Sequence, residues 1–112
     1  MTAPLTTPDT YSLTVGTDGM FSSGYGAYHR LREGVSMIQV SFEGPGALNI
    51  MLSPQADYRT KVLAKTLPAG TGLRSTVLMG VTVAKGEARY LSLGGLGGAR
   101  AGVVITTFPL AT

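Results

Sequence analysis

The sequence contains no cysteine and no tryptophan, and only 13% of its 112 residues are charged. Without cysteine there is no disulfide framework, no thiolate metal site and no thiol nucleophile. No apolar run approaches the ~20 residues that a membrane-spanning helix needs, so no membrane partner is expected. Residues 1–8 have neither a basic start nor an apolar stretch, so no signal peptide is predicted.

The charged residues do not gather into one region of the chain. Nine Lys and Arg face six Asp and Glu, which gives a net charge of +3. Because the basic residues are scattered, they do not form the stripe or cluster typical of nucleic-acid binding, and a nucleic-acid partner is not expected. A hydrophobic content of 44% with so little charge is the opposite of the composition of disordered chains. The length suits one folded domain.

Sixteen glycines and six prolines recur at short intervals, and serine and threonine fill much of the remainder. All four residue types are unfavourable inside helices. Stretches that alternate apolar with polar residues lie between these turn signals, with roughly ten residues from one to the next. The sequence therefore predicts an all-β fold, an antiparallel β-sandwich of roughly seven or eight short strands. Its topology is a jelly roll or another Greek key, and a small barrel has the same pattern.

The clearest predicted strands are residues 11–15, 35–42, 47–52, 73–84, 88–93 and 101–108. The turn at residues 43–46 predicts a hairpin between the second and third of these. Gly80 indicates a bulge within its strand. Residues 55–67 alternate with period two and favour a strand, although Ser53 and Pro54 would also suit a helix start.

The apolar positions of the predicted strands define a core that should be mostly buried. Its predicted members are Ile38, Val40, Phe42, Leu48, Ile50, Leu52, Val77, Met79, Val81, Val103 and Ile105.

Residues 1–10 differ from the rest of the chain because they hold two prolines and four threonines and show no packing periodicity. They predict an extended N-terminal arm, followed by a single β-sandwich domain over residues 11–112. Proline biases its neighbours toward extended conformations, and such an arm can become ordered along a neighbouring subunit. Pro4, Leu5 and Pro8 are its candidate contact residues.

Side chains that could carry catalysis are few. The single histidine, His29, lies near Ser22, Ser23 and Asp18, but the chain lacks the Gly-x-Ser-x-Gly elbow of a serine hydrolase. A surface imidazole is the simpler interpretation of His29. The six carboxylates lie in predicted loops, turns or the arm, where a glycosidase pair would not meet across a cleft. No enzymatic activity, no catalytic residue, no metal site and no cofactor are predicted.

Aromatic and basic residues do gather near the histidine. Tyr25 and Tyr28 stand beside His29, Arg30 and Arg32, a combination that binds sugars and single-stranded nucleic acids by stacking. Phe21 lies in a glycine-rich stretch over residues 16–26 and should be exposed. Phe21, Tyr25, Tyr28, Arg30 and the arm are the candidate interaction residues, with Asn49 or Asp18 as further sugar contacts. Tyrosines that only fill a sheet are the alternative interpretation.

A small, cysteine-free, weakly charged β domain with an arm resembles, in composition alone, the small decoration, cement or tail subunits of bacteriophages. The resemblance implies a non-enzymatic structural or assembly subunit of a virion. Its partners would be further copies of itself or a major structural protein, and its location would be the virion. Without the resemblance, the location is the cytoplasm or is not predicted. The alternative is a carbohydrate-binding, lectin-like β-sandwich module, against which the missing tryptophan counts.

Overall fold

The computed structural model describes residues 8–16, 20–22, 28–55, 61–95 and 99–109. This part of the chain contains eight β-strands and no helix, so none of it forms an apolar helix that could cross a membrane. The strands are β1 (Asp9–Val15), β2 (His29–Arg30), β3 (Gly34–Phe42), β4 (Leu48–Ser53), β5 (Val62–Leu67), β6 (Arg74–Val83), β7 (Tyr90–Gly94) and β8 (Ala101–Phe108). The predicted all-β fold is confirmed.

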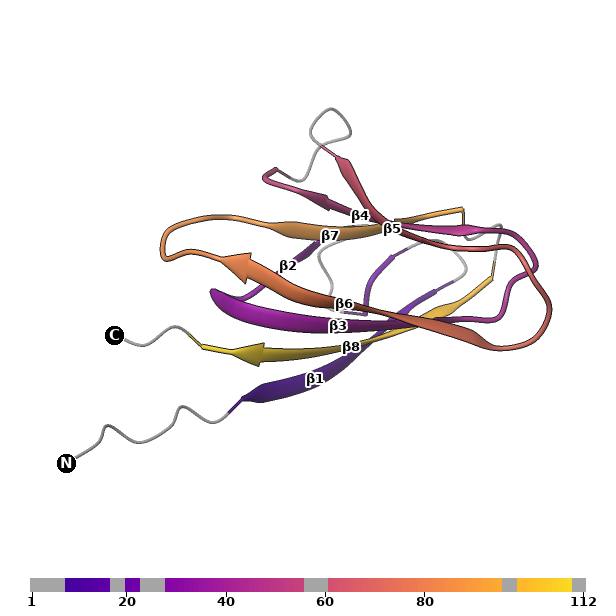
Figure 1. Ribbon diagram of the computed structural model, residues 1–112, viewed down its shortest axis with the longest axis horizontal. Helices are drawn as coiled ribbons and strands as arrows, with labels where there is room; N and C mark the ends of the chain where they lie inside the picture. The colour runs from indigo at the N-terminus through magenta and orange to yellow at the C-terminus, as the bar shows by residue number, and fades with distance from the viewer. Residues whose placement is uncertain (1–7, 17–19, 23–27, 56–60, 96–98, 110–112) are drawn as a thin grey trace.

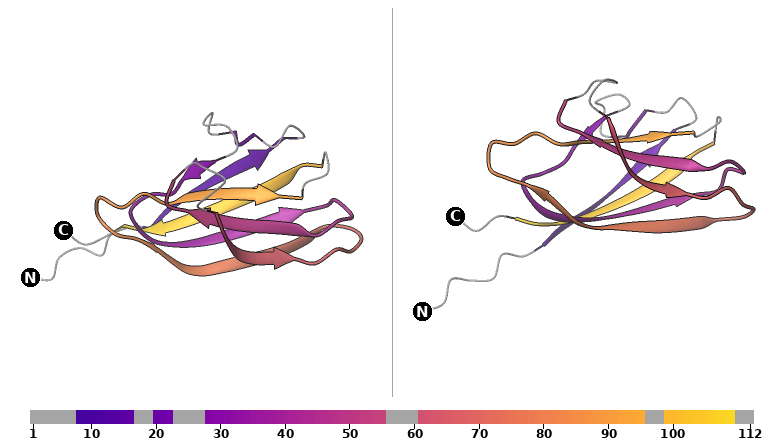
Figure 2. Two further views of the ribbon diagram at one scale, coloured as in Figure 1. Left: turned by 90° about the horizontal axis from the view of Figure 1, so that it is seen from above. Right: turned by 45° about the horizontal axis from the view of Figure 1, so that its top comes forward.

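The strands form two four-stranded antiparallel sheets that lie one above the other (Figures 1 and 2). Sheet A has the order β1-β8-β3-β6, and sheet B has the order β2-β7-β4-β5. The first strand pairs with the eighth, the second with the seventh, the third with the sixth and the fourth with the fifth. The chain therefore behaves as one long antiparallel ribbon that winds through both sheets, which is the jelly-roll arrangement. The predicted sandwich is confirmed.

The predicted hairpin between residues 35–42 and 47–52 is wrong, because β3 belongs to sheet A and β4 to sheet B. The turn at residues 43–47 is a corner that carries the chain from one sheet to the other. Arg74 of β6 holds this corner, since its guanidinium donates hydrogen bonds to the carbonyl oxygens of Gly44 and Gly46. Gly44 is also required by space, because a Cβ there would overlap the ring of Phe42.

Most of the predicted core is buried between the sheets: Ile38, Val40, Phe42, Leu48, Ile50, Val103 and Ile105. Leu52 and Val81 pack against this core while partly buried.

The predicted burial of Met79 is wrong, since its side chain is 72% exposed, and Val77 is only half-buried. The reason is the bulge. The β3–β6 register shifts between Ser36 and Ile38, opposite Gly80, which has φ of 67°. The shift inverts the alternation of β6, so Leu78 packs against the core before the bulge and Val81 after it.

The predicted arm (residues 1–10) and the predicted strand at residues 55–67 are each described only in part. Strand β1 begins at Asp9, two residues earlier than expected, so Asp9 and Thr10 of the predicted arm pair with β8. Strand β5 confirms the strand interpretation for the second half of residues 55–67. Residues 1–7 and 56–60 lie outside the described residues.

Candidate functional site

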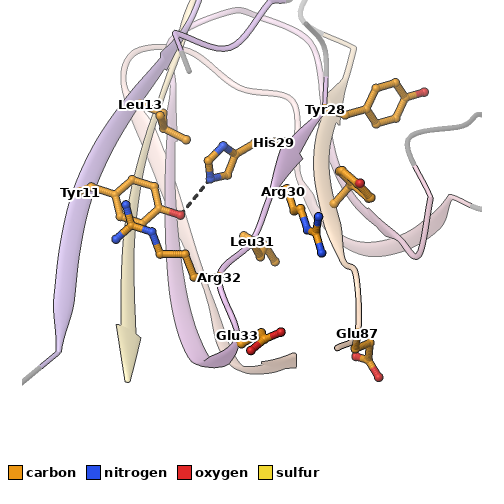
Figure 3. A pocket seen from close by; sticks show the side chains of 10 residues that line it. Tyr11, Leu13, Tyr28, His29, Arg30, Leu31, Arg32, Glu33 and Glu87 are labelled. Carbon is orange, nitrogen blue, oxygen red and sulfur yellow. Dashed lines mark hydrogen bonds between the residues drawn. The ribbon is translucent and has the colours of Figure 1, made fainter. Parts of the chain in front are cut away.

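An open cavity of about 900 Å³ lies at the sandwich edge formed by β1 of sheet A and β2 of sheet B (Figure 3). Strand β2 has only two residues, so sheet B covers little of the inner side of β1 at this edge. The cavity is lined by Tyr11, Leu13, Tyr28, His29, Arg30, Leu31, Arg32, Glu33, Glu87 and Tyr90.

A hydrogen bond between two residues of the cavity wall joins the two sheets. The Tyr11 hydroxyl of β1 and Nε2 of His29 in β2 lie 2.9 Å apart. The rings of Tyr11 and Phe21 lie 5.6 Å and 5.9 Å from the His29 ring. Burial raises the pKa of Tyr11 to about 12 and lowers the pKa of His29 below its ordinary value. Both groups are therefore uncharged at neutral pH.

The prediction that His29 is a surface imidazole is wrong, because its side chain is only 8% exposed. The alternation of the chain explains the difference. His29 and Leu31 point into the sandwich, and Arg30 between them is exposed at its edge, where it lines the mouth of the open cavity.

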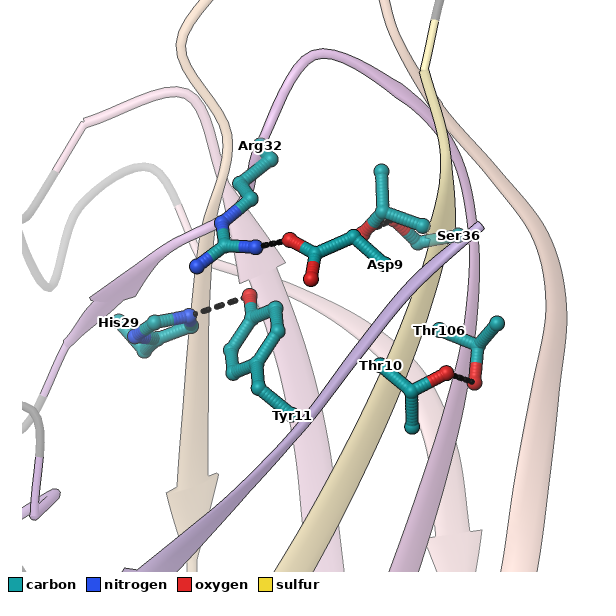
Figure 4. A network of polar contacts seen from close by, with 8 residues as sticks. Asp9, Thr10, Tyr11, His29, Arg32, Ser36 and Thr106 are labelled. Atoms are coloured by element: carbon teal, nitrogen blue, oxygen red, sulfur yellow. Dashed lines mark hydrogen bonds and ion pairs between the residues drawn. The ribbon is translucent and has the colours of Figure 1, made fainter. Parts of the chain in front are cut away.

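Most charges around the cavity already have partners. Arg32 forms an ion pair with Asp9, and its guanidinium carbon lies 4.2 Å from the centre of the Tyr11 ring (Figure 4). A Glu33 carboxylate oxygen accepts a hydrogen bond of 2.8 Å from the backbone N–H of Gly86.

At the other side of the cavity, Glu87 and Arg89 form an ion pair of 3.1 Å. Arg30 differs from these residues: it is exposed, and no carboxylate of the described residues pairs with it. Among the charged residues that line the cavity, Arg30 is the one with neither an ion pair nor a hydrogen bond in the described part of the chain, and the charge of Glu33 is not paired either.

A second feature is the outer face of sheet A, formed by the strand residues that point away from sheet B. Its members are Thr10, Ser12, Thr14, Val35, Met37, Gln39, Ser41, Ser75, Val77, Met79, Thr82, Gly102, Val104, Thr106 and Phe108. None of them carries a charge. Val35, Met79, Val104 and Phe108 are exposed apolar residues, and Val35 is the cross-strand partner of Phe108.

The structure brings together only some of the predicted interaction residues. Tyr28 and Arg30 line the cavity. The prediction that Phe21 is exposed is wrong. Phe21 is only 3% exposed, because it forms a bridge with Val15 and packs beside His29. Pro8 is exposed directly before β1.

The other predicted contacts do not reach the cavity or cannot be placed. Asn49 is exposed on β4, where its side-chain oxygen accepts a hydrogen bond from Thr66, and it does not line the cavity. Pro4, Leu5, Asp18 and Tyr25 lie outside the described residues.

Tyr11 and the uncharged face were missed from the sequence, whereas Arg32 was recognised as a neighbour of Tyr28 and Arg30. The face has a local signal: the polar positions of residues 11–15, 35–42 and 101–108 are only Ser, Thr, Gln and Gly. Tyr11 has no such signal, because its partner His29 is reached across the two sheets.

No group of three or more His, Cys, Asp and Glu side chains in the described part of the chain is placed to hold a metal ion. No protein-family model matches the chain, and no curated protein or solved structure gives a significant match to it.

Proposed function

We propose that the protein is a non-enzymatic structural subunit that assembles through protein–protein contacts on the outer face of sheet A. The observation that carries the proposal is that this face bears no charge while it exposes Val35, Val104 and Phe108. Sheet faces that remain in water usually carry charged residues, and the centres of protein interfaces are depleted of them. An uncharged face with exposed apolar side chains is typical of a surface that becomes covered.

The size of the face suits a contact at the lower end of specific interfaces. Four strands spaced by ~4.8 Å and about eight residues long at ~3.3 Å per residue give roughly 500 Å². Two such faces in contact would bury about 1,000 Å², which is close to the lower limit for a specific interface. We therefore expect this face alone to give moderate affinity, with further contacts in a larger assembly.

The first partner that the chemistry favours is a second copy of the same chain. Neither copy brings a charge that must be taken out of water, so a symmetric contact of the two faces has no ionic desolvation cost. A major structural protein with a similar uncharged surface is the other partner of this kind.

The proposed setting is the virion of a bacteriophage, as a capsid decoration, cement or tail component. Two features support it: the composition, and the jelly-roll architecture that capsid proteins share with lectins and other proteins. Because one fold serves many functions, the genes beside the coding sequence are the direct test of this setting. A neighbouring portal or major capsid gene is the expected result, and an operon of metabolic genes would contradict it.

Sedimentation of the full-length protein tests the assembly itself. The weight-average mass of the wild type should rise with concentration. Val104→Lys places a charge in the middle of the face on β8, and we expect it to weaken self-association by at least about tenfold.

Leu63→Lys is the matched control, because it makes the same change at an exposed apolar residue of sheet B. It should leave self-association unchanged. A wild type that stays monomeric and binds no other structural protein, or an equal loss in both variants, would overturn the proposal.

A further inference from the structure

We propose that the cavity between β1 and β2 binds a sugar that carries a carboxylate, with Arg30 holding the carboxylate group. This inference is independent of the assembly proposed above. The cavity volume of about 900 Å³ lies in the range of small-molecule sites, which is roughly 300–1,000 Å³. A mono- or disaccharide fits within that volume.

The walls of the cavity combine apolar and aromatic surface with a few polar groups, as binding sites for small molecules do. Leu13 and Leu31 supply aliphatic surface, and Tyr11, Tyr28 and Tyr90 supply rings. In Figure 3, Tyr11 comes from β1, and Tyr28 directly precedes β2 with its ring directed away from Tyr11. Such rings contact the C–H faces of a sugar and need no large conformational change to do so.

The Tyr11 wall is built before any ligand arrives. Tyr11 is fixed through its hydroxyl by His29 and across its ring by Arg32, which Asp9 holds in turn. Groups held in this way lose little freedom when a ligand binds. His29 also keeps one buried ring nitrogen, Nδ1, without a hydrogen-bond partner among the described residues.

The charges select the chemistry of the ligand. Arg32 and Glu87 form ion pairs and Glu33 accepts a backbone hydrogen bond, whereas Arg30 has neither kind of partner in the described part of the chain. A guanidinium binds a carboxylate through two parallel hydrogen bonds, which a neutral sugar does not offer.

The two glutamates complete the match. Each carboxylate oxygen accepts more than one hydrogen bond, so Glu33 and Glu87 keep acceptor capacity for sugar hydroxyls. A bare carboxylate would satisfy Arg30 and leave the tyrosine and leucine walls uncovered. A ring with both hydroxyls and a carboxylate uses all three kinds of surface. Two arginines and two glutamates around one cavity are not the basic stripe that a nucleic acid requires.

A titration of the full-length protein with defined sugars tests the proposal, and the chemical shifts of the backbone amides report binding. Glucuronate and N-acetylneuraminate are the acidic probes, and glucose and acetate are the neutral sugar and the bare carboxylate. At least one acidic sugar should bind saturably, and glucose and acetate should bind at least about tenfold more weakly. Binding of neither acidic sugar would overturn the proposal, as would equal binding of acetate.

Substitution of Arg30 tests the residue. Arg30→Gln should weaken binding of the acidic sugar by about tenfold or more, and Arg30→Lys, which keeps the charge but loses the planar fork, by about threefold. Arg100→Gln is the matched control, because it changes the net charge equally at an exposed arginine that does not line the cavity. An equal loss in Arg100→Gln would overturn the role of Arg30. Sedimentation of Arg30→Gln should match the wild type, so this result and the assembly result are distinguishable.

Discussion

Replacing Phe42 by alanine tests the register of β3 and the packing of the core in one measurement. Phe42 is 1% exposed and is the largest fully buried side chain among the described residues. An aromatic side chain buries about 150–250 Å², and apolar area stabilises by ~25 cal/mol per Å², which gives about 4 kcal/mol of transfer free energy. The cost expected for a Phe-to-Ala change in a core, about 3–5 kcal/mol, agrees with this value.

The surroundings of Phe42 place the expected loss in the upper half of that range. The Arg74 guanidinium carbon lies 5.6 Å from the centre of the Phe42 ring, and the same guanidinium holds the corner at residues 43–47. Removal of the ring leaves Arg74 above a cavity and loosens the sheet-to-sheet connection. A domain of this length has a free energy of unfolding of roughly 6–17 kcal/mol, so the variant should still fold.

Urea unfolding followed by far-UV circular dichroism measures the effect. With a denaturant slope of about 2 kcal/mol per M, the midpoint should fall by about 2 M. Phe108→Ala is the control, because Phe108 is 51% exposed, and at a concentration low enough to prevent association it should lose less than about 1 kcal/mol. Equal midpoints for the two variants would mean that Phe42 is not buried and that the register of β3 differs by one residue from the one given above.

Two further changes test the histidine and the arm. Burial lowers the pKa of His29 below 6.5, so as the pH falls through 6.5 the unfolded chain binds a proton before the folded protein does. The contribution of neutral His29 to the free energy of unfolding should therefore be complete above about pH 6.5 and decrease as the pH falls below that value. His29→Gln removes this group, so it should reduce the difference in urea midpoint between about pH 7.5 and about pH 5.5. Deletion of residues 2–7 should leave the thermal midpoint unchanged and weaken assembly in sedimentation. Deletion of residues 2–10 should lower the midpoint, because it also removes Asp9, the partner of Arg32. An unchanged pH dependence in His29→Gln, or a lower midpoint in the shorter deletion, would contradict these expectations.

The strands could be predicted from the sequence because alternation of apolar and polar residues is a local property. In β3, every second residue is buried, as the pattern over residues 35–42 indicates. The partner of each strand is not local. The Gly-Pro-Gly turn at residues 44–46 suits both a hairpin and a sheet-to-sheet corner, and Arg74, which binds the corner, is far away in the sequence.

The bulge shows the same limit within a single strand. Gly80 marks its position, but the sequence does not tell which side chains turn over on each side of it. The register with β3 decides this, so Met79 is exposed while Leu78 packs against the core.

The candidate site could be predicted only where its residues adjoin in sequence. Tyr28 and Arg30 are neighbours, and their aromatic and basic character points to an interaction site. Tyr11 comes from the other sheet and joins them only because the jelly roll places β1 and β2 at one edge. Phe21 lies among glycines and serines, yet its bridge to Val15 turns it inward.

The two proposed surfaces share strand β1 but use opposite sides of it. Tyr11 and Leu13 face the cavity, whereas Thr10, Ser12 and Thr14 belong to the outer face of sheet A. Because side chains of a strand alternate between its two sides, a neighbour packed on the outer face leaves the cavity open. Such a neighbour would also hold β1, and with it the Tyr11 wall, more firmly in place. Assembly is therefore expected to keep or strengthen binding of an acidic sugar, and loss of binding on assembly would mean that the cavity itself lies in the contact.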